Sequence, residues 1–105
     1  MRYFKESIET MPREELESLQ IKKLRSMLTQ IYGHNSFYTD KFDAAGIHPE
    51  SIQTLEDLKR VPLTSKAELL QAQSDALPFG SNTTFPEAAY SRFHQTSGTT
   101  GTPLR

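Results

Sequence analysis

Regularly spaced apolar residues in the stretch 12–32 most limit how this chain can fold. They recur every three or four positions, which places them on one side of an α-helix and the charged residues on the other. Pro12 suits the start of this helix, where its missing N–H is not needed. Gly33 suits its end, because glycine readily adopts the left-handed conformation that closes many helices. The apolar positions are Leu16, Leu19, Leu24, Met27, Leu28 and Ile31.

Shorter helices joined by turns are predicted for residues 34–73. Residues 36–46 carry aromatic side chains at helical spacing and end in glycine. Residues 54–57 and 65–68 both have the pattern of a capping box, in which a hydroxyl and a carboxylate bind the free N–H groups of a helix start. Residues 74–91 are instead rich in turn-forming residues, and so long a loop is usually functional. Residues 92–95 are predicted to form a short strand.

The sequence Thr-Ser-Gly-Thr-Thr-Gly-Thr-Pro at residues 96–103 carries the clearest chemical signal. It suits neither a strand nor a helix, but it suits a cradle for an anion. Glycines let backbone N–H groups turn toward a ligand, and hydroxyls add further donors. The loop differs from the P-loop of kinases and GTPases, because no Gly-Lys-Ser/Thr follows the glycines. Composition alone leaves a flexible Ser/Thr/Gly tail as an equal alternative.

The order of these residues resembles the signature loop of adenylate-forming enzymes, which include acyl-CoA synthetases, luciferases and peptide-synthetase adenylation domains. Thr102 stands where that superfamily usually has lysine. Shorter upstream motifs occur in the order and spacing of phenylacetate–CoA ligases, so the similarity covers nearly the whole chain. These motifs are Phe37-Tyr38, Phe42-Asp-x-Ala-Gly-Ile47, Thr54-Leu-Glu-Asp-Leu58, Val61-Pro-Leu-Thr-x-Lys66, Pro78-Phe-Gly80 and Arg92-Phe-His94.

This resemblance implies an α/β fold, of which the chain would supply the N-terminal, mostly helical part of the large adenylation domain. Residues 1–73 would be the helical segment and residues 74–91 the loop region. Residues 92–105 would begin the nucleotide-binding core with a short strand and the phosphate loop. All three belong to one incomplete domain.

The resemblance also implies a reaction in two steps. A small carboxylic acid attacks the α-phosphate of ATP to give an acyl-adenylate and pyrophosphate, and the thiol of coenzyme A then displaces AMP. ATP, Mg²⁺ and coenzyme A are the expected cofactors, and the resemblance suggests a homodimer. No catalytic residue or metal ligand is expected in this segment, which alone should be inactive. The residues expected to hold the β- and γ-phosphates are Thr96, Ser97, Gly98, Thr99, Thr100 and Gly101.

Two alternatives stay open at this point. The parent enzyme could pass its acyl group to a carrier protein instead of coenzyme A. The 105 residues could also form a stand-alone helical binding module without catalysis. The downstream sequence would distinguish the module from an enzyme, because a ligase continues into a much longer α/β chain.

The composition limits which binding partners and which cell compartment are expected. The 12 basic and 13 acidic side chains nearly cancel, so no basic surface for nucleic acid or an anionic membrane is expected. No stretch approaches the roughly 20 apolar residues that span a bilayer. Cysteine is absent, and the N-terminus lacks the apolar run of a signal peptide. A cytoplasmic protein is therefore expected.

Overall fold

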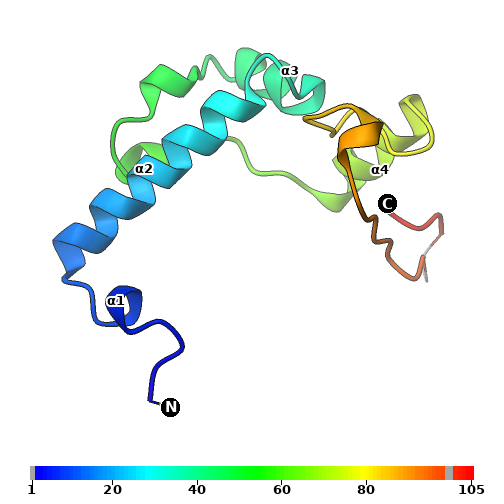
Figure 1. Cartoon of the computed structure of the whole chain (residues 1–105). Helices are drawn as coiled ribbons and strands as arrows, with labels where there is room; N and C mark the ends of the chain where they lie inside the picture. The colour runs from blue at the N-terminus through cyan, green and yellow to red at the C-terminus, as the bar shows by residue number, and fades with distance from the viewer. Residues whose placement is uncertain (1, 99–100) are drawn as a thin grey trace.

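The computed structural model describes residues 2–98 and 101–105, and these residues form helices joined by turns and loops (Figure 1). The α-helices are α1 (Glu6–Glu9), α2 (Arg13–Ile31), α3 (Ser36–Ala44) and α4 (Lys66–Asp75). Three 3-10 helices, η1 (Pro49–Ser51), η2 (Glu56–Arg60) and η3 (Glu87–Ala89), lie between or after them.

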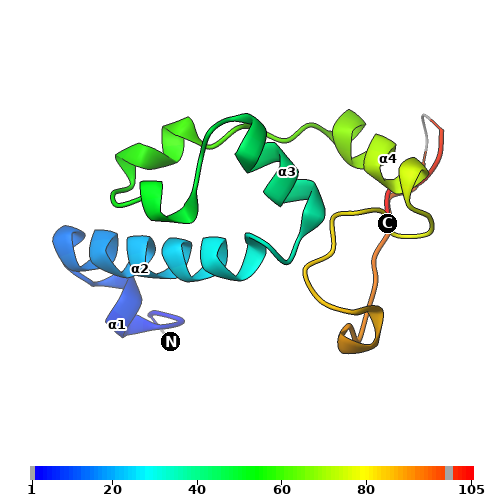
Figure 2. The same ribbon diagram turned by 90° about the horizontal axis from the view of Figure 1, so that it is seen from above.

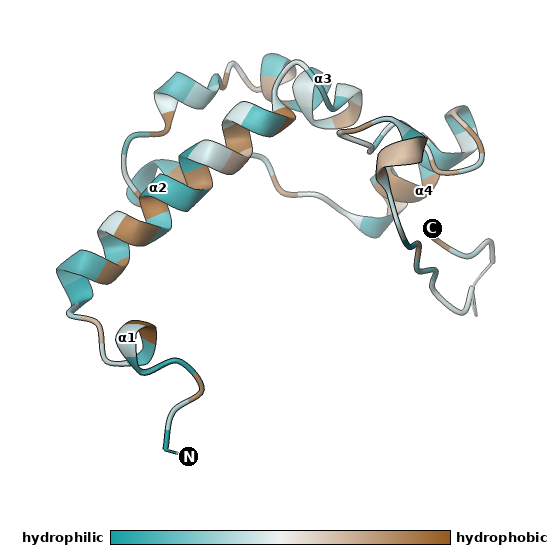
Figure 3. Ribbon diagram, in the orientation of Figure 1, coloured by the Kyte–Doolittle hydropathy of each residue, from teal (hydrophilic) through white to brown (hydrophobic). Residues whose placement is uncertain are grey.

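The predicted long helix is confirmed as α2. Pro12 directly precedes its first residue, and Gly33, with a φ of +82°, follows its C-terminal cap. Apolar and polar residues alternate along it, as Figure 3 shows. The segment that holds η1 and η2 runs back along α2, and α3 lies near the end of that helix (Figure 2).

The capping box predicted at residues 65–68 is formed. At the start of α4, the Ser65 hydroxyl accepts from the N–H of Glu68, and the Glu68 carboxylate accepts from the N–H of Ser65. These bonds satisfy N–H groups that a helix start otherwise leaves without partners. Thr54 and Asp57, at residues 54–57, also bind each other reciprocally, at 3.0 and 3.3 Å, where the chain enters η2. The capping position of η2 is instead Leu55, whose side chain makes no capping bond.

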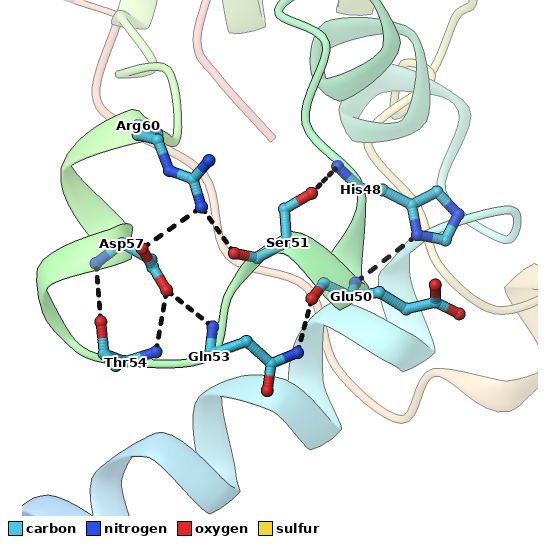
Figure 4. A network of polar contacts seen from close by, with 7 residues as sticks. All are labelled: His48, Glu50, Ser51, Gln53, Thr54, Asp57 and Arg60. Carbon is cyan, nitrogen blue, oxygen red and sulfur yellow. Dashed lines mark hydrogen bonds and ion pairs between the residues drawn. The ribbon is translucent and has the colours of Figure 1, made fainter.

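A polar network joins η1 to η2 (Figure 4). The Asp57 carboxylate accepts from the backbone N–H groups of Gln53 and Thr54, which hold the pKa of Asp57 below its usual range. The Arg60 guanidinium lies 3.3 Å from that carboxylate and donates to the Ser51 carbonyl at 2.6 Å. Asp57 therefore has a structural role in the turn between η1 and η2.

The hydrophobic core is small and lies between α2, α3 and the segment of η1 and η2. Its buried members are Leu28, Phe42, Ile47 and Ile52. The partly buried residues packed against it are Ile21, Leu24, Ile31, Tyr32, Tyr38 and Val61.

The chain is more open than a compact domain of the same length. The Cα radius of gyration is 16.9 Å, whereas a compact domain of this length has about 13 Å. The accessible surface is 8047 Å², against about 6,000 Å² for a globular monomer of this mass. Large apolar side chains remain uncovered, with Phe4 94%, Leu63 92% and Phe93 63% exposed. The chain therefore has apolar faces that suit burial against further structure.

The predicted α/β class and the predicted strand at residues 92–95 are not found in the described part of the chain, which contains helices and no strand. Residues 92–95 are exposed. A strand requires a neighbour whose backbone pairs with its own N–H and C=O groups. The described residues of this chain supply no such neighbour, so the sequence preference alone leaves the segment irregular.

A charged contact links α3 to α4 and gives a prediction about pH. The Lys41 ammonium lies 2.7 Å from the Glu68 carboxylate, and this bond, followed by those from Ser65, lowers the pKa of Glu68 from 4.5 to about 2. A carboxyl group with a lowered pKa in the folded state stabilises that state above its unfolded pKa. The contribution is lost as pH falls from 4.5 toward about 2.

We therefore expect the urea midpoint of the chain, followed by circular dichroism, to fall more steeply in this pH window than that of the Glu68→Gln variant. Glu17→Gln is the matched control, because Glu17 pairs with exposed Arg13 on its own helix. Its midpoint should follow that of the unchanged chain. Identical pH curves for the unchanged chain and Glu68→Gln would contradict the assignment.

Candidate functional site

The Thr/Ser/Gly-rich segment forms a loop that is closed at its base. The N–H of Thr96 donates to the carbonyl of Leu104 at 2.8 Å. The N–H of Leu104 donates in return to the hydroxyl oxygen of Thr96 at 2.9 Å. A reciprocal pair of hydrogen bonds thus joins the two limbs of the loop, although Thr96 and Leu104 are eight positions apart in sequence.

Gly98 and Gly101 shape the tip of the loop. Both have positive φ, +70° and +145°, and the N–H of Gly101 donates to the carbonyl of Gly98 at 3.0 Å. A Cβ on Gly98 would lie 2.7 Å from the Gly101 oxygen and 2.8 Å from the ring of Pro103. Only glycine fits at position 98 without displacing the backbone, whereas a Cβ on Gly101 would meet nothing within 4 Å.

The predicted phosphate-binding residues differ in how the structure uses them: some close the loop by hydrogen bonds, and others are exposed or half-buried. Thr96 and Gly101 use their N–H groups to close the loop. The Thr96 hydroxyl accepts one bond, and its own hydrogen can still be donated to a ligand. Ser97 is exposed and Gly98 half-buried. Thr99 and Thr100 lie outside the described residues.

A hollow of about 440 Å³ is lined by residues that precede the loop in sequence and by Arg105, which follows it. Phe79 and Phe93, whose ring centroids are 5.8 Å apart, line it together with Arg92 and Arg105. Because Phe93 is largely exposed, this hollow is also one of the uncovered apolar regions of the chain.

His94, which precedes the loop by two positions, is exposed. Within residues 2–98 and 101–105, no three His, Cys, Asp or Glu side chains are grouped so that they could hold a metal ion. In the same part of the chain, no helix is both long and apolar enough to cross a membrane.

Known proteins similar to this chain are acid–coenzyme A ligases, although no family model matches it. The phenylacetate–coenzyme A ligase of Thermus thermophilus is 38% identical over 100 residues, which are 95% of this chain and 21% of that protein. The Escherichia coli enzyme of the same name is 40% identical over 96 residues, 91% of this chain and 21% of that protein.

Solved structures agree with the sequence comparison. A 2-hydroxyisobutyryl-CoA ligase, crystallised with 2-HIB-AMP and CoA in the thioesterification state, matches with a TM-score of 0.90 and 34% identity. The match covers 99% of this chain and 22% of the ligase chain. The open conformation of that ligase matches with a TM-score of 0.89 and 31% identity.

The helical architecture therefore places the chain with the N-terminal part of adenylate-forming acid–coenzyme A ligases. Among these ligases, it is homologous to the phenylacetate–coenzyme A ligases, which confirms the family that the sequence motifs indicated. The chain spans about a fifth of the length of the curated relatives it matches.

Proposed function

We propose that this chain supplies the ATP-phosphate loop of an adenylate-forming acid–coenzyme A ligase. The observation that carries the proposal is the loop closed by Thr96 and Leu104. At Gly98 this loop has no room for a side chain, because a Cβ there would clash with the Gly101 oxygen and the Pro103 ring. A tight turn of glycine backbone with hydroxyls around it suits the binding of phosphate oxygens. Homology to ligases that make acyl-adenylates supports the same chemistry.

In this role the loop binds and orients the β- and γ-phosphates while the carboxylate attacks the α-phosphate. Hydroxyl donors come from Thr96, Ser97, Thr99 and Thr100, and each hydrogen bond to a charged oxygen is worth about 1.5–3 kcal/mol. Mg²⁺ would neutralise part of the charge and bind mainly through phosphate oxygens, as it does at many ATP sites. Residues 92–95 would form their strand once a neighbouring strand is present.

Coenzyme A is the proposed acyl acceptor, and an aryl-substituted small carboxylic acid is the proposed substrate, both by likeness to the relatives. The stand-alone binding module is less well supported, because the open shape and the uncovered apolar side chains suit part of a larger domain. The proposed site of action is the cytoplasm.

The test uses a chimeric ligase in which this chain replaces the matching residues of the Thermus thermophilus enzyme. ATP–pyrophosphate exchange measures adenylate formation, and thioester formation from supplied acyl-adenylate measures the second step. Ser97→Ala should lower exchange about 100-fold, as the loss of one preorganised donor does elsewhere. Thioester formation should change much less, because that step involves no pyrophosphate.

Ser26→Ala is the matched control, since Ser26 is an exposed serine on α2, away from the loop. It should leave both activities unchanged. Equal losses in both steps for Ser97→Ala would show that the loop acts through folding. A chimera that unfolds cooperatively but makes no adenylate would refute the proposed function itself.

A further inference from the structure

Gln73 is a buried polar side chain that neither the helix nor the phosphate loop explains by itself. It lies near the end of α4, and only 2% of it is exposed. Buried side-chain amides are costly unless both their N–H and C=O groups find partners. The partners of Gln73 come from residues 30 and 32 positions further along the chain.

Both ends of the Gln73 amide bind the backbone that leaves the phosphate loop. Its Nε2 donates to the carbonyl of Pro103 at 2.9 Å. Its Oε1 accepts from the N–H of Arg105 at 2.8 Å. The side chain thus satisfies one carbonyl and one N–H on a single extended stretch, as a neighbouring strand would do. The chain end and α4 lie side by side in Figures 1 and 2.

The position of Gln73 is itself fixed by the turn that follows α4. The N–H of Gly80 donates to the carbonyl of Ala76 at 2.7 Å, which folds the chain back onto the helix. A Cβ on Gly80 would lie only 2.9 Å from the Cα of Gln73. The Arg105 guanidinium donates to the Pro78 carbonyl in the same turn, at 3.4 Å. Residues 76–80 and residues 103–105 therefore both pack against Gln73.

We call the two hydrogen bonds from the Gln73 amide to Pro103 and Arg105 the Gln73 clamp. The clamp lies next to the residues that set the shape of the loop. Pro103, whose carbonyl Gln73 holds, carries the ring that packs on Gly98. Leu104, between the two clamped residues, forms the reciprocal pair with Thr96. A shift of residues 103–105 would therefore move both the base of the loop at Leu104 and the Pro103 ring that packs on Gly98.

We propose that Gln73 is a positioning residue for adenylate formation: it holds the outgoing limb of the phosphate loop in register on α4, so that the loop donors meet the ATP phosphates. This inference rests on the proposed function of the loop. Gln73 itself touches no substrate in this role. It acts through Pro103 and Arg105.

The test compares Gln73→Met with Gln71→Met in the chimeric ligase. Methionine keeps the length of the side chain and removes both hydrogen bonds to the loop. Gln71 is the matched control, because it is exposed on the same helix and its side chain donates to Asp75 on that helix. Gln73→Met should lower ATP–pyrophosphate exchange about 100-fold, the cost of a small misplacement of catalytic groups. Thioester formation from supplied adenylate should be largely spared.

Hydrogen exchange provides a second measurement that does not depend on activity. In Gln73→Met, the peptide containing Leu104 and Arg105 should exchange about tenfold faster, which corresponds to the loss of one ordinary hydrogen bond. In Gln71→Met, its exchange should stay unchanged. If the unmodified chimera makes no adenylate, the proposed function fails and this measurement alone decides whether the clamp exists.

Two results would overturn the inference. One is a Gln73→Met variant that loses no more exchange activity than Gln71→Met. The other is an equal loss of both half-reactions, which would mean that Gln73 only supports folding.

Discussion

Replacing Gly98 with alanine is expected to lower ATP–pyrophosphate exchange by the chimeric ligase about 1000-fold, the upper range for losing a preorganised electrostatic contact. Two effects combine at this position. The φ of +70° is unfavourable for any residue with a Cβ. The added methyl group would also meet the Gly101 oxygen at 2.7 Å, and neither this backbone atom nor the Pro103 ring can move without opening the loop.

Gly46→Ala separates these two effects. Gly46 has almost the same φ, +68°, but a Cβ there would meet nothing within 4 Å. This control therefore carries only the backbone cost, about 1–2 kcal/mol of stability, and should keep both half-reactions. Thioester formation from supplied adenylate should also survive in Gly98→Ala. If Gly98→Ala and Gly46→Ala behaved alike in the exchange assay, close packing at Gly98 would have no role in phosphate binding.

Local features of this structure could be predicted from sequence. The start and end of α2 depend on Pro12 and Gly33, and the cap of α4 depends on Ser65 and Glu68, which are three positions apart. Such signals are contained within one or two helical turns, so no knowledge of the fold is needed to find them. The glycines and hydroxyls at residues 96–103 likewise indicated an irregular loop, and the bonds between Thr96 and Leu104 close one. The binding of an anion by this loop stays a prediction.

Long-range features could not be predicted in the same way. Nothing in the sequence distinguishes Gln73 from Gln71, two residues earlier on the same helix. Only the return of the chain after 30 residues gives Gln73 its partners. The closure of the loop by Thr96 and Leu104 depends on that same return. The strand expected at residues 92–95 was not found for the related reason that pairing depends on a neighbour.

Phe42→Ala is expected to destabilise the chain by about 3–5 kcal/mol, the usual cost of removing a buried phenylalanine. Phe42 is 3% exposed and joins α3 to the core, where it packs with Leu28, Ile47 and Ile52. A domain of about 100 residues is stable by only about 5–15 kcal/mol, and this chain has four residues in its main core cluster. The loss should therefore remove most of the helical circular dichroism signal well before the urea midpoint of the unchanged chain.

Phe4→Ala is the matched control, because it deletes the same side chain where 94% of it is exposed. Exposed substitutions usually change stability by no more than about 0.5 kcal/mol, so its urea midpoint should stay near that of the unchanged chain. In the chimeric ligase, Phe42→Ala should lower both half-reactions together, since the helical segment carries the turn and α4 to which the loop is tied. A selective loss of pyrophosphate exchange in Phe42→Ala would instead indicate that the core acts on the loop directly, and equal midpoints for the two variants would contradict the core assignment.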